Sequence, residues 1–178
     1  GNADSRFKLG EALAAAGQLE QAAQEFQKAG ILSLGQKNFT RAAYGFGRAI
    51  EAAGGPDKLE QPVGDQAVQA LFMAAPDPEV WPLVDRLQKE FREWPVLGSI
   101  QARCQLYAAR LPRAKELIDG ILAANPLDPL AGAVRAEINL KSGDAQGTKQ
   151  TIDKVMSQSK PPPWLMDFLA GLLKQLGP

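Results

Sequence analysis

Residues 9–49 decide the fold of this chain, and their sequence is LGEALAAAGQLEQAAQEFQKAGILSLGQKNFTRAAYGFGRA. A turn followed by a helical pattern occurs twice in this stretch, and the second copy lies 20 residues after the first. Each copy has an Ala, a Phe four residues later and an Ala three residues after that: Ala22, Phe26 and Ala29, then Ala42, Phe46 and Ala49. These offsets place the three side chains on one helix face, where a small, a large and a small residue can receive a neighbouring helix closely. The stretch therefore predicts stacked helical hairpins.

Apolar residues recur at helical spacing along almost the whole chain, and the alternation that is typical of β-strands is absent from the sequence. We therefore predict an all-α fold in a single domain that spans residues 1–178. About ten helices are expected, at residues 4–16, 19–36, 39–53, 64–75, 78–93, 96–109, 112–124, 129–142, 145–157 and 163–176.

Several of these boundaries have a local chemical cause. In Asp77-Pro78 and Asp128-Pro129 the carboxylate can cap a helix N-terminus, and proline is favoured at the first helical position because no N–H is lost there. Gly143-Asp144 ends one helix and begins the next. The interval 54–63 contains two glycines and two prolines and is the best candidate for a hinge or an exposed loop. A short helix at 57–61 is an alternative for part of it.

Composition narrows the class of protein. The chain has 178 residues, 45% of them apolar, which is enough to bury a continuous core. Lys and Arg number 20, as do Asp and Glu, so the net charge is zero and nucleic acid is not expected as a partner. No apolar run approaches the roughly 18 residues of a membrane span. The start at Gly1, without methionine, suggests a trimmed N-terminus, so the compartment, cytoplasmic or exported, is left open.

Few residues are suited to catalysis. The chain has no histidine, which excludes His-based triads, the HExxH zinc site and imidazole acid–base catalysis. Cys104 is the single cysteine, lies on an apolar helical stripe and is expected to be a buried, inert thiol. Glu116 and Asp119 share one helix face, as many solvated acids do. We therefore predict no catalytic residue, no metal site and no cofactor.

Three parts of the chain share a longer pattern. The first has Leu9-Gly10, Leu13, Ala22, Phe26 and Ala29; the second has Ala114, Ile118, Ile121 and Pro126; the third, 34 residues later, has Thr148, Ile152, Val155 and the prolines 161–163. This pattern resembles that of the tetratricopeptide repeat family, whose repeat also spans about 34 residues. Residues 54–94 match it poorly, and a generic α-solenoid is the alternative.

The resemblance implies a right-handed α–α superhelix of antiparallel helices with a degenerate middle repeat. Counting helices backwards from 145–157 pairs helix 39–53 with helix 19–36 and leaves helix 4–16 as an N-terminal cap. If residues 57–61 form a helix, the count shifts, and helix 4–16 becomes the first helix of a repeat. Helix 163–176 is expected to cap the C-terminal end of the array.

The resemblance also implies a binding surface, since the first helix of each hairpin in that family lines a concave groove that holds a peptide. Carried over to this chain, the groove consists of Gln24, Gln27, Lys28 and Ile31, then Ser99, Arg103, Leu106 and Tyr107, then Ala133, Glu137, Leu140 and Lys141. Arg103 and Tyr107 are the expected anchors, because both offer a large contact area with directional polar groups. The Lys and Asn clamp that some relatives use for a C-terminal carboxylate has no counterpart here. Its positions hold Phe7 and Glu11 in one frame, and Gln27 and Ile31 in the other.

The predicted function is a non-catalytic protein–protein interaction scaffold that binds a peptide or protein segment. Two alternatives stay open. The chain can be the helical accessory part, or the carboxylate-based catalytic part, of a larger enzyme. It can also be a structural homo-oligomer that self-associates through the apolar face of helix 163–176, with Leu165, Phe168, Leu169 and Leu172.

Overall fold

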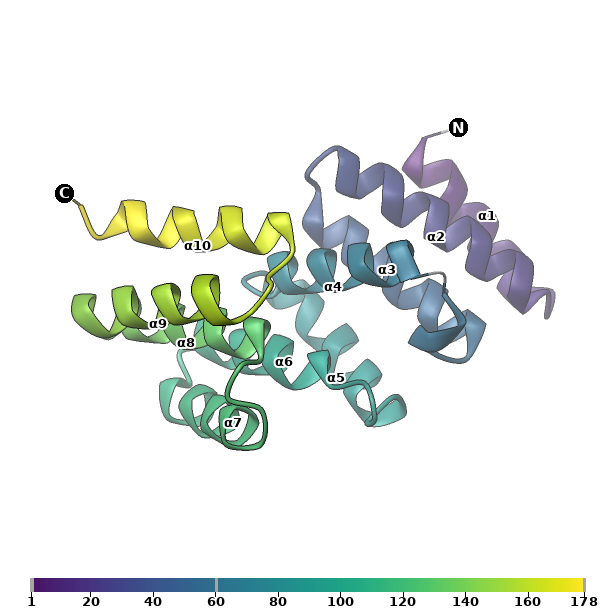
Figure 1. Ribbon diagram of the computed structural model, residues 1–178. Coiled ribbons are helices and arrows are strands. Elements are labelled where there is room, and N and C mark those ends of the chain that lie inside the picture. Colours follow the sequence, from purple (N-terminus) through teal and green to yellow (C-terminus); the bar gives the residue numbers. More distant parts are fainter. Residues whose placement is uncertain (1, 60, 178) are drawn as a thin grey trace. The chain divides into compact units, whose positions relative to one another are not determined.

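The computed structural model describes residues 2–59 and 61–177, with the side chains of 61 and 62 left out. Helices and turns, and no strand, make up the described part of the chain, which confirms the predicted all-α class (Figure 1). The α-helices are α1 (Ala3–Ala15), α2 (Leu19–Gly35), α3 (Phe39–Ala53), α4 (Gln61–Ala74), α5 (Trp81–Glu90), α6 (Val96–Tyr107), α7 (Leu111–Ala124), α8 (Pro129–Lys141), α9 (Ala145–Gln158) and α10 (Pro163–Gln175). Two short 3₁₀ helices are η1 (Pro56–Lys58) and η2 (Pro78–Val80).

The region between α3 and α6 differs most from the prediction. The expected helix 78–93 is divided into η2 and α5, and α5 ends at Glu90. It cannot extend through Trp94, because Pro95 disfavours helical backbone for the residue before it. The expected loop 54–63 is shorter, since α4 begins at Gln61, and η1 occupies part of the interval in which a short helix was the alternative.

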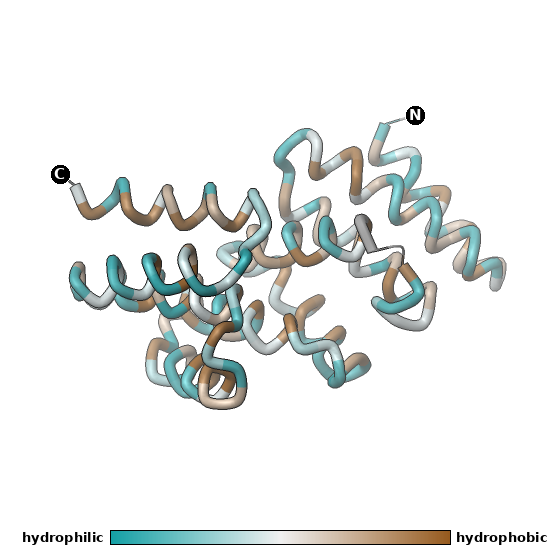
Figure 2. Tube along the Cα trace, viewed as in Figure 1, coloured by the Kyte–Doolittle hydropathy of each residue, from teal (hydrophilic) through white to brown (hydrophobic). Residues whose placement is uncertain are grey.

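The chain forms two compact units, residues Gly1–Leu97 (unit 1) and Gly98–Pro178 (unit 2), which we describe separately. In unit 1, α1 packs on α2, α2 on α3, and α3 on α4 and α5. In unit 2, α8 packs on α7 and α9, and α10 packs on α8 and α9. Hydrophobic and hydrophilic positions alternate along the helices (Figure 2), as expected for helices with one buried face. The single domain and the right-handed superhelix stay predictions.

Glycines bring the first three helices unusually close together. A Cβ on Gly10 of α1 would lie 2.8 Å from the ring of Phe26, and a Cβ on Gly30 of α2 would lie 3.0 Å from the ring of Phe46. Each Phe is fully buried. A Cβ on Gly45 of α3 would lie 2.6 Å from the backbone nitrogen of Gly30. The doubled sequence pattern is therefore a doubled packing contact, in which a glycine receives the Phe that follows it by 16 residues.

The same helix-ending turn recurs after α1, α2, α6 and α8. Its left-handed residues are Gly17 (φ 75°), Lys37 (φ 57°), Ala109 (φ 59°) and Gly143 (φ 78°). The next residue donates its N–H to a carbonyl five positions back, for instance Gln18 to Leu13 at 2.9 Å and Asp144 to Asn139 at 2.9 Å. This 6→1 bond satisfies a free carbonyl of the helix end and reverses the chain within two residues. Helices joined in this way are held as antiparallel neighbours.

The C-terminal helix α10 turns its apolar face inward. Leu165 and Leu169 are fully buried and Leu172 is 4% exposed, because α10 packs on α8 and α9. The predicted self-association surface is therefore corrected: three of its four side chains belong to the core of unit 2. The fourth, Phe168, is partly exposed and packs under Arg103.

Candidate functional site

The predicted anchor Arg103 forms a buried ion pair with the predicted site residue Glu137. Arg103 Nε donates to Glu137 Oε2 at 2.7 Å, and a second guanidinium nitrogen donates to Oε1 at 3.1 Å. Each residue is 3% exposed. This two-bond geometry between α6 and α8 is the strong form of a charge-assisted hydrogen bond. It fixes the register of the two helices.

Aromatic and cationic side chains complete this cluster. Tyr107 donates its hydroxyl to Glu137 Oε1 at 2.6 Å. The guanidinium carbon of Arg103 lies 5.5 Å from the ring centroid of Tyr107 and 4.8 Å from that of Phe168 on α10. Lys141 Nζ lies 4.5 Å from the Tyr107 ring. We call Arg103, Tyr107, Glu137, Lys141 and Phe168 the Arg103–Glu137 cluster; it joins α6, α8 and α10.

The Tyr107 hydroxyl is expected to ionise near pH 12. Burial, and then the negative charge of Glu137 and its hydrogen bond, raise the pKa of Tyr107 from 10.0 to about 12. Since the folded-state pKa is the higher one, its stabilising contribution is present below about pH 10 and is lost as the pH rises toward 12. Ultraviolet absorbance of tyrosinate follows the step, which Tyr107→Phe should remove. An unchanged late step in that variant would assign it to another group.

The predicted groove residues of unit 2 are thus mostly internal. Ser99, Arg103, Leu106, Ala133 and Glu137 are buried, whereas Tyr107 and Leu140 are partly exposed and Lys141 is exposed. The structure brings the two predicted anchors together, but it directs Arg103 toward Glu137 and Phe168. Contact of these residues with a ligand stays a prediction.

The predicted groove residues of unit 1 lie on the outer side of α2. Gln24 and Gln27 line a groove of about 570 Å³ together with Glu20 and Lys58. Lys28 donates to Glu25 at 2.7 Å, and Glu25 also accepts from Arg6 at 2.8 Å. Hydrogen bonds from Lys28 and then Arg6 hold the pKa of Glu25 below its usual value of 4.5. Ile31 is 38% exposed.

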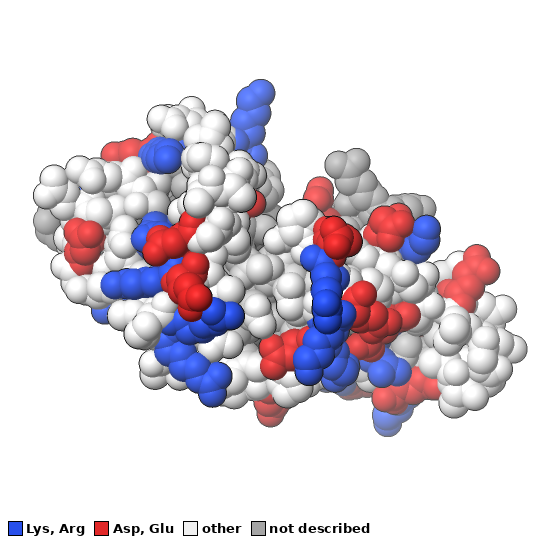
Figure 3. Space-filling model, turned by 90° about the horizontal axis from the view of Figure 1, so that it is seen from below, with Lys and Arg blue, Asp and Glu red and all other residues white. Residues whose placement is uncertain are grey.

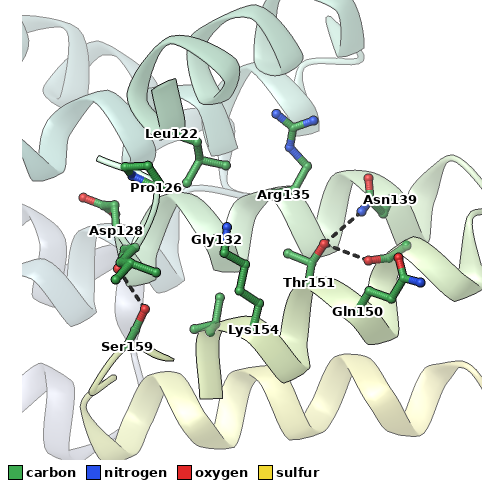
Figure 4. A pocket seen from close by; sticks show the side chains of 13 residues that line it. Leu122, Pro126, Asp128, Gly132, Arg135, Asn139, Gln150, Thr151, Lys154 and Ser159 are labelled. Carbon is green, nitrogen blue, oxygen red and sulfur yellow. Dashed lines mark hydrogen bonds between the residues drawn. The ribbon is translucent and has the colours of Figure 1, made fainter. Parts of the chain in front are cut away.

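A groove of about 420 Å³ lies beside α8 and α9 in unit 2 (Figure 4). Its polar side chains largely bond to the protein itself. Asn139 donates to Thr151 at 3.3 Å, Thr151 donates to the Gly147 carbonyl at 2.7 Å, and Ser159 donates to the Leu127 carbonyl at 2.8 Å. These bonds hold the groove walls in place and leave fewer polar groups for a ligand.

A second groove, of about 590 Å³, lies in unit 1 and is lined by more arginine and aromatic side chains. It draws side chains from α1, α3, η2 and α5, and we call it the α1–α3–α5 groove. Its lining residues are Phe7, Glu11, Asn38, Thr40, Arg41, Tyr44, Arg48, Glu79 and Arg86. Phe7 meets the Phe26 ring edge-on, with the centroids 5.2 Å apart, so the floor of the groove is continuous with the core.

Intrachain bonds hold the arginines of the α1–α3–α5 groove in place. Arg41 pairs with Asp4. Glu51 accepts from Arg86 at 3.0 Å and lies 3.6 Å from Arg48. Because a guanidinium has five N–H donors in a fixed fork, donors beyond those used here can serve a ligand.

The polar groups between η2 and α3 are fixed in the same way. Tyr44 donates its hydroxyl to the Glu79 carbonyl at 2.7 Å, and Thr40 donates to Asp77 at 2.6 Å. The bond from Thr40, and then that from the Glu79 N–H, lowers the pKa of Asp77 from its usual 3.8. The η2 turn is thereby bound to α3.

Sequence reasoning named only Phe7 and Glu11 from this groove, as the residues that occupy the positions of a clamp. Helical spacing in the sequence could have identified three further residues of this groove. Arg41, Tyr44 and Arg48 stand at positions i, i+3 and i+7 of α3, which places them on one helix face. Their meeting with Arg86 of α5 is a tertiary contact that spacing along the chain does not give.

Comparisons with protein-family models, with curated proteins and with solved structures found no match. Among the residues that the structure describes, no group of three or more His, Cys, Asp or Glu side chains is placed to hold a metal ion. Within 2–59 and 61–177, no helix is long and apolar enough to cross a bilayer. On the face drawn in Figure 3, cationic and anionic side chains stand next to one another.

Proposed function

We propose that the chain is a non-catalytic protein-interaction module that binds an extended peptide segment of a partner in the α1–α3–α5 groove. One observation carries the proposal: Tyr44 lies between Arg41 and Arg48 on one face of α3, in a groove open to solvent. Arg and Tyr are enriched among the residues that dominate binding energy at protein interfaces. Their intrachain bonds lower the cost of ordering them when a partner binds.

The helices that line this groove agree with one frame of the tetratricopeptide-like pattern. In that frame α1 and α3 are first helices of successive hairpins, and Phe7 and Glu11 face the ligand. The first-frame assignment, in which helix 4–16 opens a repeat, is therefore the frame we favour within unit 1. The tetratricopeptide-like superhelix itself is part of the proposal.

The enzyme alternative requires two carboxylates from different helices in one pocket. Glu11 and Glu79 both line the α1–α3–α5 groove, so that alternative has a specific candidate pair. Peptide binding is favoured because four of the nine lining residues are Arg or Tyr, which suit contact area and hydrogen bonding better than proton transfer.

Selection from a random peptide library displayed on phage tests the proposal. The wild-type chain is expected to enrich related peptides, and Tyr44→Ala combined with Arg48→Ala should weaken their binding about tenfold or more. Arg113→Ala is the matched control, because Arg113 is an exposed arginine of unit 2 that pairs at the surface with Glu116. Circular dichroism confirms that each variant is folded.

Two results would contradict this function. One is the absence of any enriched sequence family with the folded wild-type chain. The other is equal binding of the selected peptides by wild type and by the Tyr44→Ala, Arg48→Ala variant.

A further inference from the structure

Another groove of unit 1 is lined by residues within 54–59, 64–68 and 90–96. Its volume is about 750 Å³. We propose that this groove, the Trp94 groove, binds a basic peptide segment in which an Arg or Lys stands beside an apolar residue. The proposal rests on other residues than those of the α1–α3–α5 groove, and it can hold or fail separately.

The two walls are built by chain reversals rather than by facing helices. On one side α3 ends at Ala53 and is capped by Gly54 (φ 79°); the backbone N–H of Gly55 donates to the Ile50 carbonyl at 3.0 Å, and η1 follows. On the other side α5 ends at Glu90, and the backbone N–H of Trp94 donates to the Phe91 carbonyl at 3.0 Å. Apolar side chains line both walls: Pro56, Leu59, Val68, Phe91, Trp94 and Val96.

Trp94 is the clearest sign that the groove serves a ligand. It is partly exposed, and no hydrogen bond of its indole N–H is found within the described residues. Trp81, by contrast, donates its indole N–H to the Ala75 carbonyl at 2.9 Å. Partly exposed tryptophans with an available N–H are enriched at binding surfaces, where the ring gives contact area and the N–H gives direction.

The charge of the groove is strongly one-sided, although the whole chain is neutral. Four carboxylates line it, Asp57, Asp65, Glu90 and Glu93, against one guanidinium, that of Arg92. Asp57 lies 3.1 Å from Lys58, whereas for the other three carboxylates no ion pair is found in the described part of the chain. Asp57 and Asp65 come from the lining segments 54–59 and 64–68, and Glu90 and Glu93 from the segment 90–96, so each of these segments brings carboxylates to the groove.

The aromatic and apolar walls, together with the carboxylates, favour a basic peptide as the ligand. A Lys or Arg side chain can lie over the face of Trp94 or Phe91, an attraction that grows as water is excluded. Its charged end meets carboxylates, which form the stronger, charge-assisted hydrogen bonds. The aliphatic part of the same side chain, and an apolar neighbour, cover Leu59 and Val68. An acidic peptide or a nucleic acid backbone would instead meet like charge.

A labelled synthetic peptide of alternating Arg and Leu tests the proposal on the full chain. Fluorescence anisotropy measures binding at low salt, and the indole N–H signals in the NMR spectrum report where the peptide lies. The signal of Trp94, assigned with Trp94→Phe, is expected to shift on binding more than those of Trp81 and Trp164. The same peptide with citrulline in place of Arg, which has the shape but not the charge, should bind about tenfold more weakly.

Matched variants separate this groove from general attraction. Trp94→Ala is expected to weaken binding about tenfold, and Glu90→Gln with Glu93→Gln about threefold to tenfold. Glu116→Gln with Asp119→Asn removes two exposed carboxylates of unit 2 and should leave binding within about twofold of wild type.

Several outcomes would overturn the proposal. The first is an unshifted Trp94 signal at saturating peptide. The second is equal binding of the Arg and citrulline peptides. The third is equal weakening by the Glu116→Gln, Asp119→Asn variant and by the Glu90→Gln, Glu93→Gln variant. Concentration-dependent self-association that Trp94→Ala abolishes would assign the groove to a second copy of the chain instead.

Discussion

Glu137→Ala is expected to lower the free energy of unfolding by about 3–5 kcal/mol. The change removes the carboxylate that accepts both Arg103 bonds and the Tyr107 hydroxyl. It also breaks a buried bidentate ion pair, and breaking a buried pair costs far more than a surface pair contributes. Urea denaturation followed by circular dichroism measures the loss.

Two further variants show whether burial is the cause. Glu116→Ala removes an exposed i,i+3 pair with Arg113 and should cost less than about 1 kcal/mol. Arg103→Met combined with Glu137→Leu removes both charges and fills the space, and it should be much less destabilising than Glu137→Ala alone. Equal losses of unfolding free energy in Glu137→Ala and Glu116→Ala would show that the buried pair contributes no more to stability than the surface pair.

Gly45→Ala is expected to destabilise unit 1 by about 2–3 kcal/mol, although alanine is the better helix former. The new Cβ would lie 2.6 Å from the backbone nitrogen of Gly30 and 2.7 Å from its Cα. Backbone atoms cannot rotate away as the end of a side chain can, so α2 and α3 must separate. That separation would loosen the fully buried Phe26 and Phe46.

Gly120→Ala is the matched control for this substitution. Gly120 lies inside α7, and a Cβ there would meet no atom within 4 Å. Alanine should therefore stabilise the chain by roughly 0.5–1 kcal/mol through lower backbone entropy and better helix propensity. Opposite signs for the two substitutions in urea denaturation support the close α2–α3 contact. A stabilising Gly45→Ala would contradict it.

The helices themselves were largely predictable from local chemistry. Asp128 accepts the Ala131 N–H at 2.8 Å and Asp144 accepts the Gly147 N–H at 2.8 Å, as their positions before the helices indicated. Prediction was poorer between α3 and α6. There the 3₁₀ turns depend on tertiary bonds such as the one from Thr40 to Asp77, which joins residues 37 apart in the sequence.

The candidate site was harder to predict, because helical spacing tells which residues share a face but not what covers that face. Arg103, Glu137 and Tyr107 were predicted as one surface and do lie together, yet α10 places Phe168 against Arg103 and their bonds are internal. The polar face of α3, with Arg41, Tyr44 and Arg48, was not singled out. This face becomes one side of a groove because Phe7 of α1 and Arg86 of α5 also line it.

The sequence of residues 9–49 by itself determined that α1, α2 and α3 are helices with matched small and large positions, since helix offsets, glycines and caps act over a few residues. It did not determine that Gly10 receives Phe26, that Gly30 receives Phe46, or how near Gly45 comes to Gly30. Those contacts, and the grooves beside them, depend on the angle and distance at which whole helices pack. Tertiary structure decides these through the shapes of many buried side chains acting together.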